Sequence, residues 1–364
     1  MGSGKRNRII IIITRIQMNK SNVLIIGSGN RVQKTILPAL CCLPNKYNIV
    51  GICSRTEKNL ILPGGKRTIR TIIDMDTIDL RHVDIIIIAV TTEIIPEVIH
   101  SLTRQSVHHI VLFLDTPVLY MKHIHTARLF SLFRNVYVTE DYIAMPITDV
   151  VKRIVQTGVI GKLKQIYLFH SGYKYHALAF LRRILSEQSI STMIKKALSG
   201  AISEIHIRFP GGIRATIVEP KDYAAGRLLV IGEKGFISDY PLSGERAINI
   251  AYTFKNGIYG GMNISGEVVE KHRITNPLYW SIIRDLLDTS LINCIKIEGL
   301  IRLFESLSDQ PFTYAYSYEE GLYDSAASAI LDAYGFFIDA RPPFVHESIM
   351  RKIIGIMKHV SSLM

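Results

Sequence analysis

Glycines at a strand-to-helix turn are the strongest candidates for binding chemistry in this sequence. The apolar run 22–26 is followed by Gly27-Ser28-Gly29 and then by apolar residues at helical spacing as far as Leu40. In such a turn the first glycine permits a tight bend, and the second lets backbone approach a pyrophosphate at the positive helix end. Val32 replaces the third glycine of the dinucleotide fingerprint, so an ordinary turn remains the alternative.

The end of the second predicted strand bears on which dinucleotide would bind. The segment Cys53-Ser54-Arg55-Thr56 carries no acid to hold the ribose of NAD, and Arg55 could pair with a 2′-phosphate. This composition favours NADP over NAD. The alternative is that Arg55 is a solvated loop residue.

A second polar cluster, Tyr173-Lys174-Tyr175-His176, could handle protons. Oxidising an alcohol or reducing a carbonyl requires a group that exchanges a proton near neutral pH. Histidine titrates in that range, and burial can tune a lysine downward. We expect His176 to donate or accept the proton, with Lys174 or Tyr173 as its helper. His176 could equally be a packed or capping residue of the helix that it begins, and Lys174 a surface charge.

Metal and disulfide chemistry is not expected. No cluster of His, Cys, Asp and Glu has the spacing of metal ligands, and the four cysteines show no CxxC pair.

The elements around these residues indicate an α/β protein. Apolar strands at 49–53, 85–90 and 110–114 alternate with helical stretches at 94–102 and 119–133. This alternation predicts a dinucleotide-binding Rossmann domain, with a doubly wound parallel sheet, over residues 18–140. Residues 1–17 are basic and isoleucine-rich, and we interpret them as a disordered leader or an upstream mis-start.

Beyond residue 140 the pattern changes to strands in series, punctuated by glycines. Residues 141–364 are predicted to form an α+β substrate and oligomerisation domain with a large open, mostly antiparallel sheet. Its predicted strands are 163–169, 202–209, 213–218, 228–231, 248–254 and 258–264, and its predicted helices are 150–158, 175–185, 318–339 and 343–361, with an amphipathic stretch at 279–287 that contains Trp280.

Composition narrows the function classes. The chain has 364 residues, 43 of them Lys or Arg against 31 Asp or Glu, and 48% are apolar, which excludes a disordered chain. Its longest apolar run, residues 85–90, is too short to span a membrane. The basic residues are scattered and not interleaved with aromatic residues, so we expect a cytoplasmic protein with an anionic cofactor and neither a nucleic acid nor a membrane as partner.

Several segments, in order, resemble the glucose-fructose oxidoreductase, inositol dehydrogenase and rhizopine-catabolism (Gfo/Idh/MocA) family. They are residues 27–40, 50–56, 89–93, 151–162, 230–239 and 325–333. The resemblance implies hydride transfer between a nicotinamide and a small polar substrate that is sugar-like, a keto compound or an imine. It also implies a homodimer or homotetramer formed through the open sheet.

The resemblance also exposes two departures. The family's Glu-Lys-Pro loop falls on Asp115-Thr116-Pro117, so its lysine is missing, and its Asp–His signature falls on Gly172 and His176, so its acid is missing. Glu140 falls near the nicotinamide. The expected cofactor residues are Gly27, Gly29, Asn30, Arg31, Ser54, Arg55, Thr56, Thr91, Asp115, Thr116, Pro117 and Glu140.

Two functions therefore remain open. The first is an NADP-dependent oxidoreductase, including one that performs a specialised biosynthetic reduction. The second is a catalytically retired scaffold or regulator that keeps the cofactor site, which the joint loss of lysine and acid favours.

Overall fold

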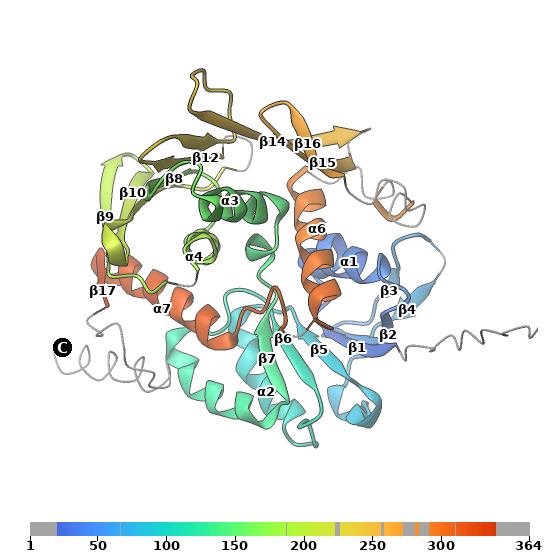
Figure 1. Cartoon of the computed structure of the whole chain (residues 1–364). Coiled ribbons are helices and arrows are strands. Elements are labelled where there is room, and N and C mark those ends of the chain that lie inside the picture. The colour runs from blue at the N-terminus through green and yellow to red at the C-terminus, as the bar shows by residue number, and fades with distance from the viewer. Residues whose placement is uncertain are drawn as a thin grey trace, which may run out of the picture.

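The structure is a computed structural model that describes residues 20–65, 67–186, 188–222, 226–255, 258–271, 281–283, 291–309 and 311–339. Two sheets dominate it, and helices pack between and around them (Figure 1). The predicted leader, the predicted helix 343–361 and Trp280 lie outside the described residues. No helix in the described part of the chain is both long and apolar enough to cross a membrane.

The first sheet is the predicted parallel sheet. Its five strands lie in the order β2-β1-β5-β6-β7, and every neighbouring pair is parallel. The side chains of β5 and β6 are buried throughout, as expected for strands covered on both faces. The strands are β1 (Ser21–Ile26), β2 (Tyr47–Cys53), β5 (Ile85–Ile88), β6 (Val111–Leu114) and β7 (Asn135–Val138).

The helical segments of this half differ in regularity. The helix after the glycine turn combines η1 (Val32–Ile36), which is π-helical, with α1 (Leu37–Cys41), and α2 spans Ile95–Leu102. The predicted helix 119–133 is instead a run of 3-10 turns, η5 (Met121–Leu132), because its apolar residues do not fall on one helical face. Sequence patterning also missed the small hairpin of β3 (Asn59–Ile61) and β4 (Thr68–Arg70).

The second sheet is large, open and mostly antiparallel, which confirms the predicted fold class. Its ten strands lie in the order β16-β15-β14-β13-β12-β8-β11-β10-β9-β17, and only the pairs β8–β11 and β13–β14 are parallel. The strands are β8 (Leu163–Phe169), β9 (Thr192–Ser199), β10 (Ile202–Arg208), β11 (Arg214–Glu219), β12 (Arg227–Gly232), β13 (Phe236–Ser238), β14 (Ala247–Lys255), β15 (Ile258–Ile264), β16 (Glu267–Lys271) and β17 (Phe336–Ile338).

Three helices cover one face of this second sheet. They are α3 (Pro146–Thr157), α4 (Lys174–Ile184) and α7 (Tyr318–Tyr334), and their apolar side chains share one core with the strands. The short turn η6 (Asp141–Ile143) leads from the first sheet into α3. Glu140, directly before η6, and His176 of α4 thus lie where the two halves meet.

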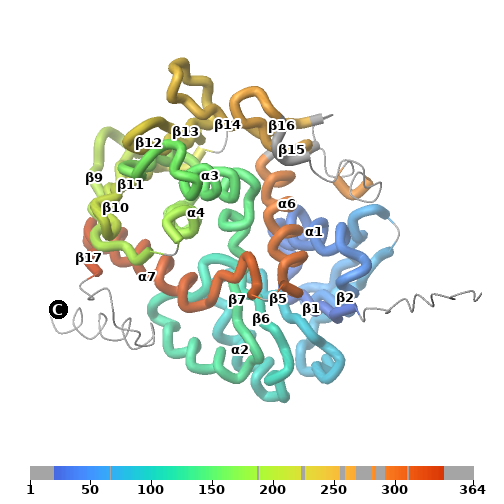
Figure 2. Tube along the Cα trace, in the orientation of Figure 1, coloured from blue at the N-terminus to red at the C-terminus, as the bar shows by residue number. Residues whose placement is uncertain are grey.

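Helix α6 (Leu291–Ser306) ties the C-terminal half of the chain to the first sheet. Its buried residues Ile297, Leu300 and Phe304 belong to the core built on β1 and β5, and Figure 2 shows the helix beside α1. A Cβ on Gly299 would stand 2.8 Å from the backbone oxygen of Asp141, so only glycine lets α6 approach η6 this closely.

Candidate functional site

The glycine turn has the geometry that its sequence predicts. Gly27 follows β1 with a φ of +122°, and a Cβ there would lie 2.2 Å from the backbone oxygen of Ala89, just after β5. Only glycine fits that position. Gly29 is the opposite case, because a Cβ built on it meets nothing within 4 Å. The turn therefore packs tightly on the sheet side and is open on the outer side.

Three backbone amides at this turn have no acceptor among the described residues. The helix runs from residue 30, and within the described chain the amides of Ser28, Gly29 and Asn30 have no hydrogen-bond acceptor. Free amides at the positive end of a helix are suited to bind phosphate oxygens. The turn therefore fits the diphosphate of a dinucleotide.

The end of β2 adds hydroxyl and cationic groups beside the turn. The hydroxyl oxygens of Ser28 and Ser54 lie 2.8 Å apart, and the Nζ of Lys58 donates to the Ser28 oxygen over 3.2 Å. Arg55 and Thr56 are exposed next to them. Sequence reasoning missed Lys58, although a second cation three residues after Arg55 was the available signal.

The segment after β6 lies at the same edge of the sheet. Asp115 follows the last residue of β6 directly, and the peptide bond between Thr116 and Pro117 is cis. The hydroxyl of Thr92 donates to the backbone oxygen of Pro117 over 3.2 Å, and Thr91 begins the turn η4 (Thr92–Ile94). The residues expected to line the cofactor cleft thus share the carboxyl edge of the parallel sheet, where ligands of such sheets bind.

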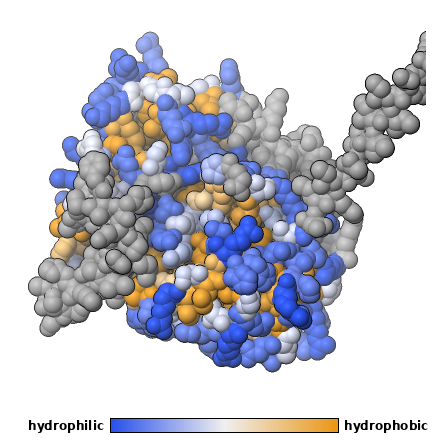
Figure 3. Space-filling view, turned by 60° about the horizontal axis from the view of Figure 1, so that its bottom comes forward, coloured by the Kyte–Doolittle hydropathy of each residue, from blue (hydrophilic) through white to orange (hydrophobic). Residues whose placement is uncertain are grey.

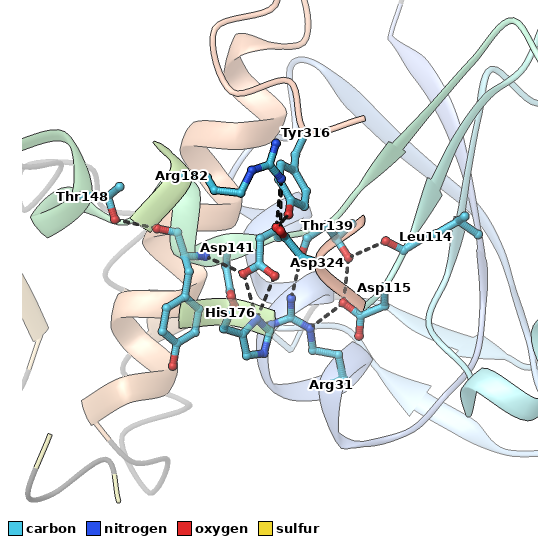
Figure 4. A network of polar contacts seen from close by, with 12 residues as sticks. Arg31, Leu114, Asp115, Thr139, Asp141, Thr148, His176, Arg182, Tyr316 and Asp324 are labelled. Carbon is cyan, nitrogen blue, oxygen red and sulfur yellow. Dashed lines mark hydrogen bonds and ion pairs between the residues drawn. The ribbon is translucent and has the colours of Figure 1, made fainter. Parts of the chain in front are cut away.

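Arg31 crosses from the glycine turn to the junction of the two halves (Figure 4). Its guanidinium donates to Asp115 over 3.2 Å, to Asp141 over 2.7 Å and to the backbone oxygen of Thr139 over 3.0 Å. Burial alone would lower the pKa of Arg31, but Asp115 and Asp141 raise it overall. Arg31, expected among the cofactor residues, is therefore held by the protein itself.

His176 forms a buried pair with Glu140. Its Nδ1 lies 2.9 Å and 2.8 Å from the two carboxylate oxygens, and the side chains are 9% and 1% exposed. The ring stacks on Tyr142 at 4.6 Å and 7°. The carboxylate of Glu140, which was expected beside the nicotinamide, contacts the histidine, and its place near a cofactor stays a prediction. No partner within the described chain occupies the second ring nitrogen, Nε2.

The two expected helpers of His176 are placed differently. The ammonium of Lys174 lies 2.7 Å from Asp332 and 3.3 Å from Glu219, in an ion-pair cluster that also contains Lys195. The charge of Lys174 thus joins α4, α7 and β11, and its helper role stays a prediction. Tyr173 is 47% exposed, and its ring centre is 6.3 Å from that of His176.

A second buried ion group lies behind the histidine pair. Arg182 of α4 donates to both oxygens of Asp324 of α7, and the hydroxyl of Tyr316 donates to the same carboxylate. Burial raises the pKa of Asp324 to about 6, and nearby Glu140 contributes to the rise.

The fold also assembles a cluster that spacing did not reveal. Single ligand atoms of Glu140, Asp141 and His176, all buried, lie within 4.8 Å of one another. No metal is expected from the sequence, because no cluster of such residues has the spacing of metal ligands along the chain. The fold brings together Glu140 and His176, which are 36 positions apart, and such a cluster cannot be seen from sequence spacing. Arg31 contacts Oδ2 of Asp141 and Glu140 pairs with His176, while Oδ1 of Asp141 is buried with no hydrogen-bond partner among the described residues.

No family model and no curated protein matches the sequence. Solved structures do share the fold. They include an oxidoreductase from Thermotoga maritima, with 16% identity, a TM-score of 0.58 and coverage of 88% of this chain and 98% of that one. Another is myo-inositol dehydrogenase from Lactobacillus casei in complex with NAD(H) and myo-inositol, with 11% identity, a TM-score of 0.58 and coverage of 90% and 99%. A third is a super-repressor mutant of Gal80p from Saccharomyces cerevisiae, with 12% identity, a TM-score of 0.60 and coverage of 88% and 98%.

Replacing Asp324 by Asn tests the electrostatics of the buried ion group. The carboxyl has a pKa of about 6 in the folded chain, against about 3.9 unfolded, so its stabilising contribution is complete below pH 4 and is lost as the pH rises through 6. The two-unit shift corresponds to roughly 3 kcal/mol. Between pH 4 and pH 7 the free energy of unfolding of the wild type should fall by about that amount relative to Asp324→Asn, as measured by urea titration. A difference in unfolding free energy between the two proteins that stays constant from pH 4 to pH 7 would contradict the raised pKa of Asp324.

Proposed function

We propose that this chain, which has the fold of Gfo/Idh/MocA-type oxidoreductases, is a nicotinamide-dinucleotide-dependent oxidoreductase. Its substrate would be small and polar, namely a sugar-like, keto or imine compound. The solved dehydrogenase from Lactobacillus casei carries NAD(H) and myo-inositol, which supports a ligand pair of this kind.

One observation carries the proposal. Arg31, two residues after the open glycine turn, is bonded to Asp115 after β6 and to Asp141, the neighbour of Glu140. The edge suited to a dinucleotide and the buried histidine pair are therefore parts of a single network. Hydride and proton exchange require the cofactor cleft and the proton-exchanging group to lie side by side.

Different groups of the protein would bind the cofactor and exchange the proton. The free amides of the turn would bind the diphosphate, and the dinucleotide would supply or accept the hydride at its nicotinamide. The free Nε2 of His176 would exchange the proton with the substrate oxygen or nitrogen. Thr116, which replaces the family's lysine, can orient a substrate by hydrogen bonding, but its hydroxyl is too weak an acid to replace a lysine.

NADP is the cofactor that we propose, with NAD second. Residues 54–56, directly after β2, include no acid, and the next acid, Glu57, is paired with Arg70. Arg55, Lys58 and the hydroxyl of Ser54 lie at this strand end, where a 2′-phosphate would bind. The solved neighbour from Lactobacillus casei contains NAD(H), so the choice depends on these side chains alone.

The alternative function is a retired scaffold or regulator with the same cofactor site. Thr116 and Gly172 stand where the family has its lysine and its acid, and a Gal80p mutant named a super-repressor shares the fold. That alternative predicts dinucleotide binding without turnover.

Replacing Gly29 by Val separates binding from folding. The position is open and does not have a positive φ, so the melting temperature should stay within the range typical of surface changes. The added side chain would block the approach of the diphosphate, and calorimetry should show a loss of NADPH affinity of about tenfold or more, near 1.4 kcal/mol. NADPH should also bind the wild type more tightly than NADH. If none of the four nicotinamide dinucleotides binds the wild type at millimolar concentration, the proposed function fails.

Replacing His176 by Ala tests the proton-exchange role. Turnover of NADPH, followed by absorbance with a panel of sugar, keto and imine substrates, should fall by about 10²- to 10⁴-fold, the usual contribution of a general acid or base. Lys196→Ala, an exposed change on β9, is the control and should leave turnover unchanged. Tight NADPH binding without turnover by the wild type across the panel would instead support the scaffold.

We further propose that the chain forms a homodimer or homotetramer through the second sheet. Ile194 and Phe336 face each other across β9 and β17 and are 48% and 53% exposed. The face that Figure 3 brings forward, the bottom of Figure 1, lies mainly over the first sheet and α2, and its apolar patches among hydrophilic ones are therefore not part of this interface. Ile194→Lys should lower the mass measured by sedimentation equilibrium, whereas Ile61→Lys on the β3–β4 hairpin should not. A monomeric wild type would refute the assembly.

A further inference from the structure

We propose that Glu140 is the positioning residue of His176, taking over from a different element the role of the family acid that this chain lacks. Glu140 fixes the ring so that Nδ1 carries the proton and Nε2 presents its lone pair to the substrate. The inference deepens the proposed function and rests on it for the identity of the reaction, although the placement of the proton can be measured without turnover.

The contact geometry supports this placement. Both carboxylate oxygens of Glu140 lie within 2.9 Å of the Nδ1 of His176, and one of them also accepts from the backbone N–H of Tyr142 over 3.1 Å. A carboxylate accepts only, so the ring must donate from Nδ1. A neutral histidine has one N–H, and Nε2 is then the nitrogen left to accept a proton.

Position 172, where the family has its acid, leaves little room for a side chain in this structure. A Cβ on Gly172 would lie 3.1 Å from a ring carbon and from the hydroxyl oxygen of Tyr142. That ring in turn stacks on His176. Tyr142 therefore fills the space that a side chain at position 172 would enter, and Glu140, directly before η6, contacts the Nδ1 of the histidine.

The surrounding charges keep the pair in place. Around it, Asp141 is paired with Arg31 and lies close to Lys296 of α6, while Asp324 of α7 is paired with Arg182. Tyr142, Tyr173 and Tyr175 supply the rings nearest to His176. Asp141 and Asp324 each have an arginine partner, so Glu140 is the carboxylate that pairs with His176.

The test is the tautomer of His176, observed by long-range ¹⁵N–¹H NMR on the full-length protein. We expect Nδ1 protonated and Nε2 unprotonated in the neutral ring of the wild type, and this preference lost in Glu140→Ala. Glu140→Gln keeps the shape and an accepting oxygen, so it should retain part of the preference even if the alanine variant folds poorly. Glu204→Ala on β10 is the control and should leave the spectrum unchanged.

Kinetics add an independent readout. Glu140→Ala should lower kcat by about 10²- to 10⁴-fold, like His176→Ala, while KM for NADPH stays within about threefold, and the double variant should be no worse than either single one. Glu140→Gln should lie between the wild type and Glu140→Ala.

The outcomes separate the two proposals. An unchanged tautomer in both Glu140 variants overturns the positioning role. A tautomer that depends on Glu140 in a protein without turnover supports the positioning role and refutes the proposed oxidoreductase function.

Discussion

The buried carboxylate of Asp141 constrains the structure around it. It is fully shielded from water, and burial alone would raise its pKa, but Arg31 and Lys296 lower it overall, so it is held as an anion. Removing one partner of such a buried pair usually costs about 3–5 kcal/mol, more than the intact pair contributes. Because Arg31 belongs to the helix after the glycine turn, satisfying Asp141 fixes that turn against the segment that enters the second half of the chain.

A second pair applies the same constraint on the other side of Glu140. Arg182 and Asp324 join α4 to α7, and Tyr316 completes the group from the segment before α7. The carboxylate of Glu140 lies close enough to influence both Arg31 and Asp324. The histidine pair is thus held between two ion groups that are anchored in different elements, which limits its freedom to reorient.

The sequence was informative where local pattern determines structure. The strand β5 and the Gly27 turn were predictable, since a four-isoleucine strand and a glycine bend are signals within one segment. The strand β9 was missed because its lysines interrupt the apolar pattern, and one of them, Lys195, pairs with acids distant in the sequence. Likewise, His176 was identified from its residue type, whereas the role of Glu140 depends on packing between elements 36 residues apart.

The buried carboxylate beside His176 bears on the choice between the two proposed functions. A chain that had abandoned chemistry would gain nothing from a buried carboxylate on a histidine, because an apolar pair of similar volume is often as stable or more stable. Here the space at Gly172 is filled by Tyr142, and a carboxylate still reaches Nδ1 from Glu140. A carboxylate therefore stays in contact with His176 although position 172 is a glycine. That retention of a costly buried pair, beside a turn with free amides, favours the oxidoreductase over the retired scaffold.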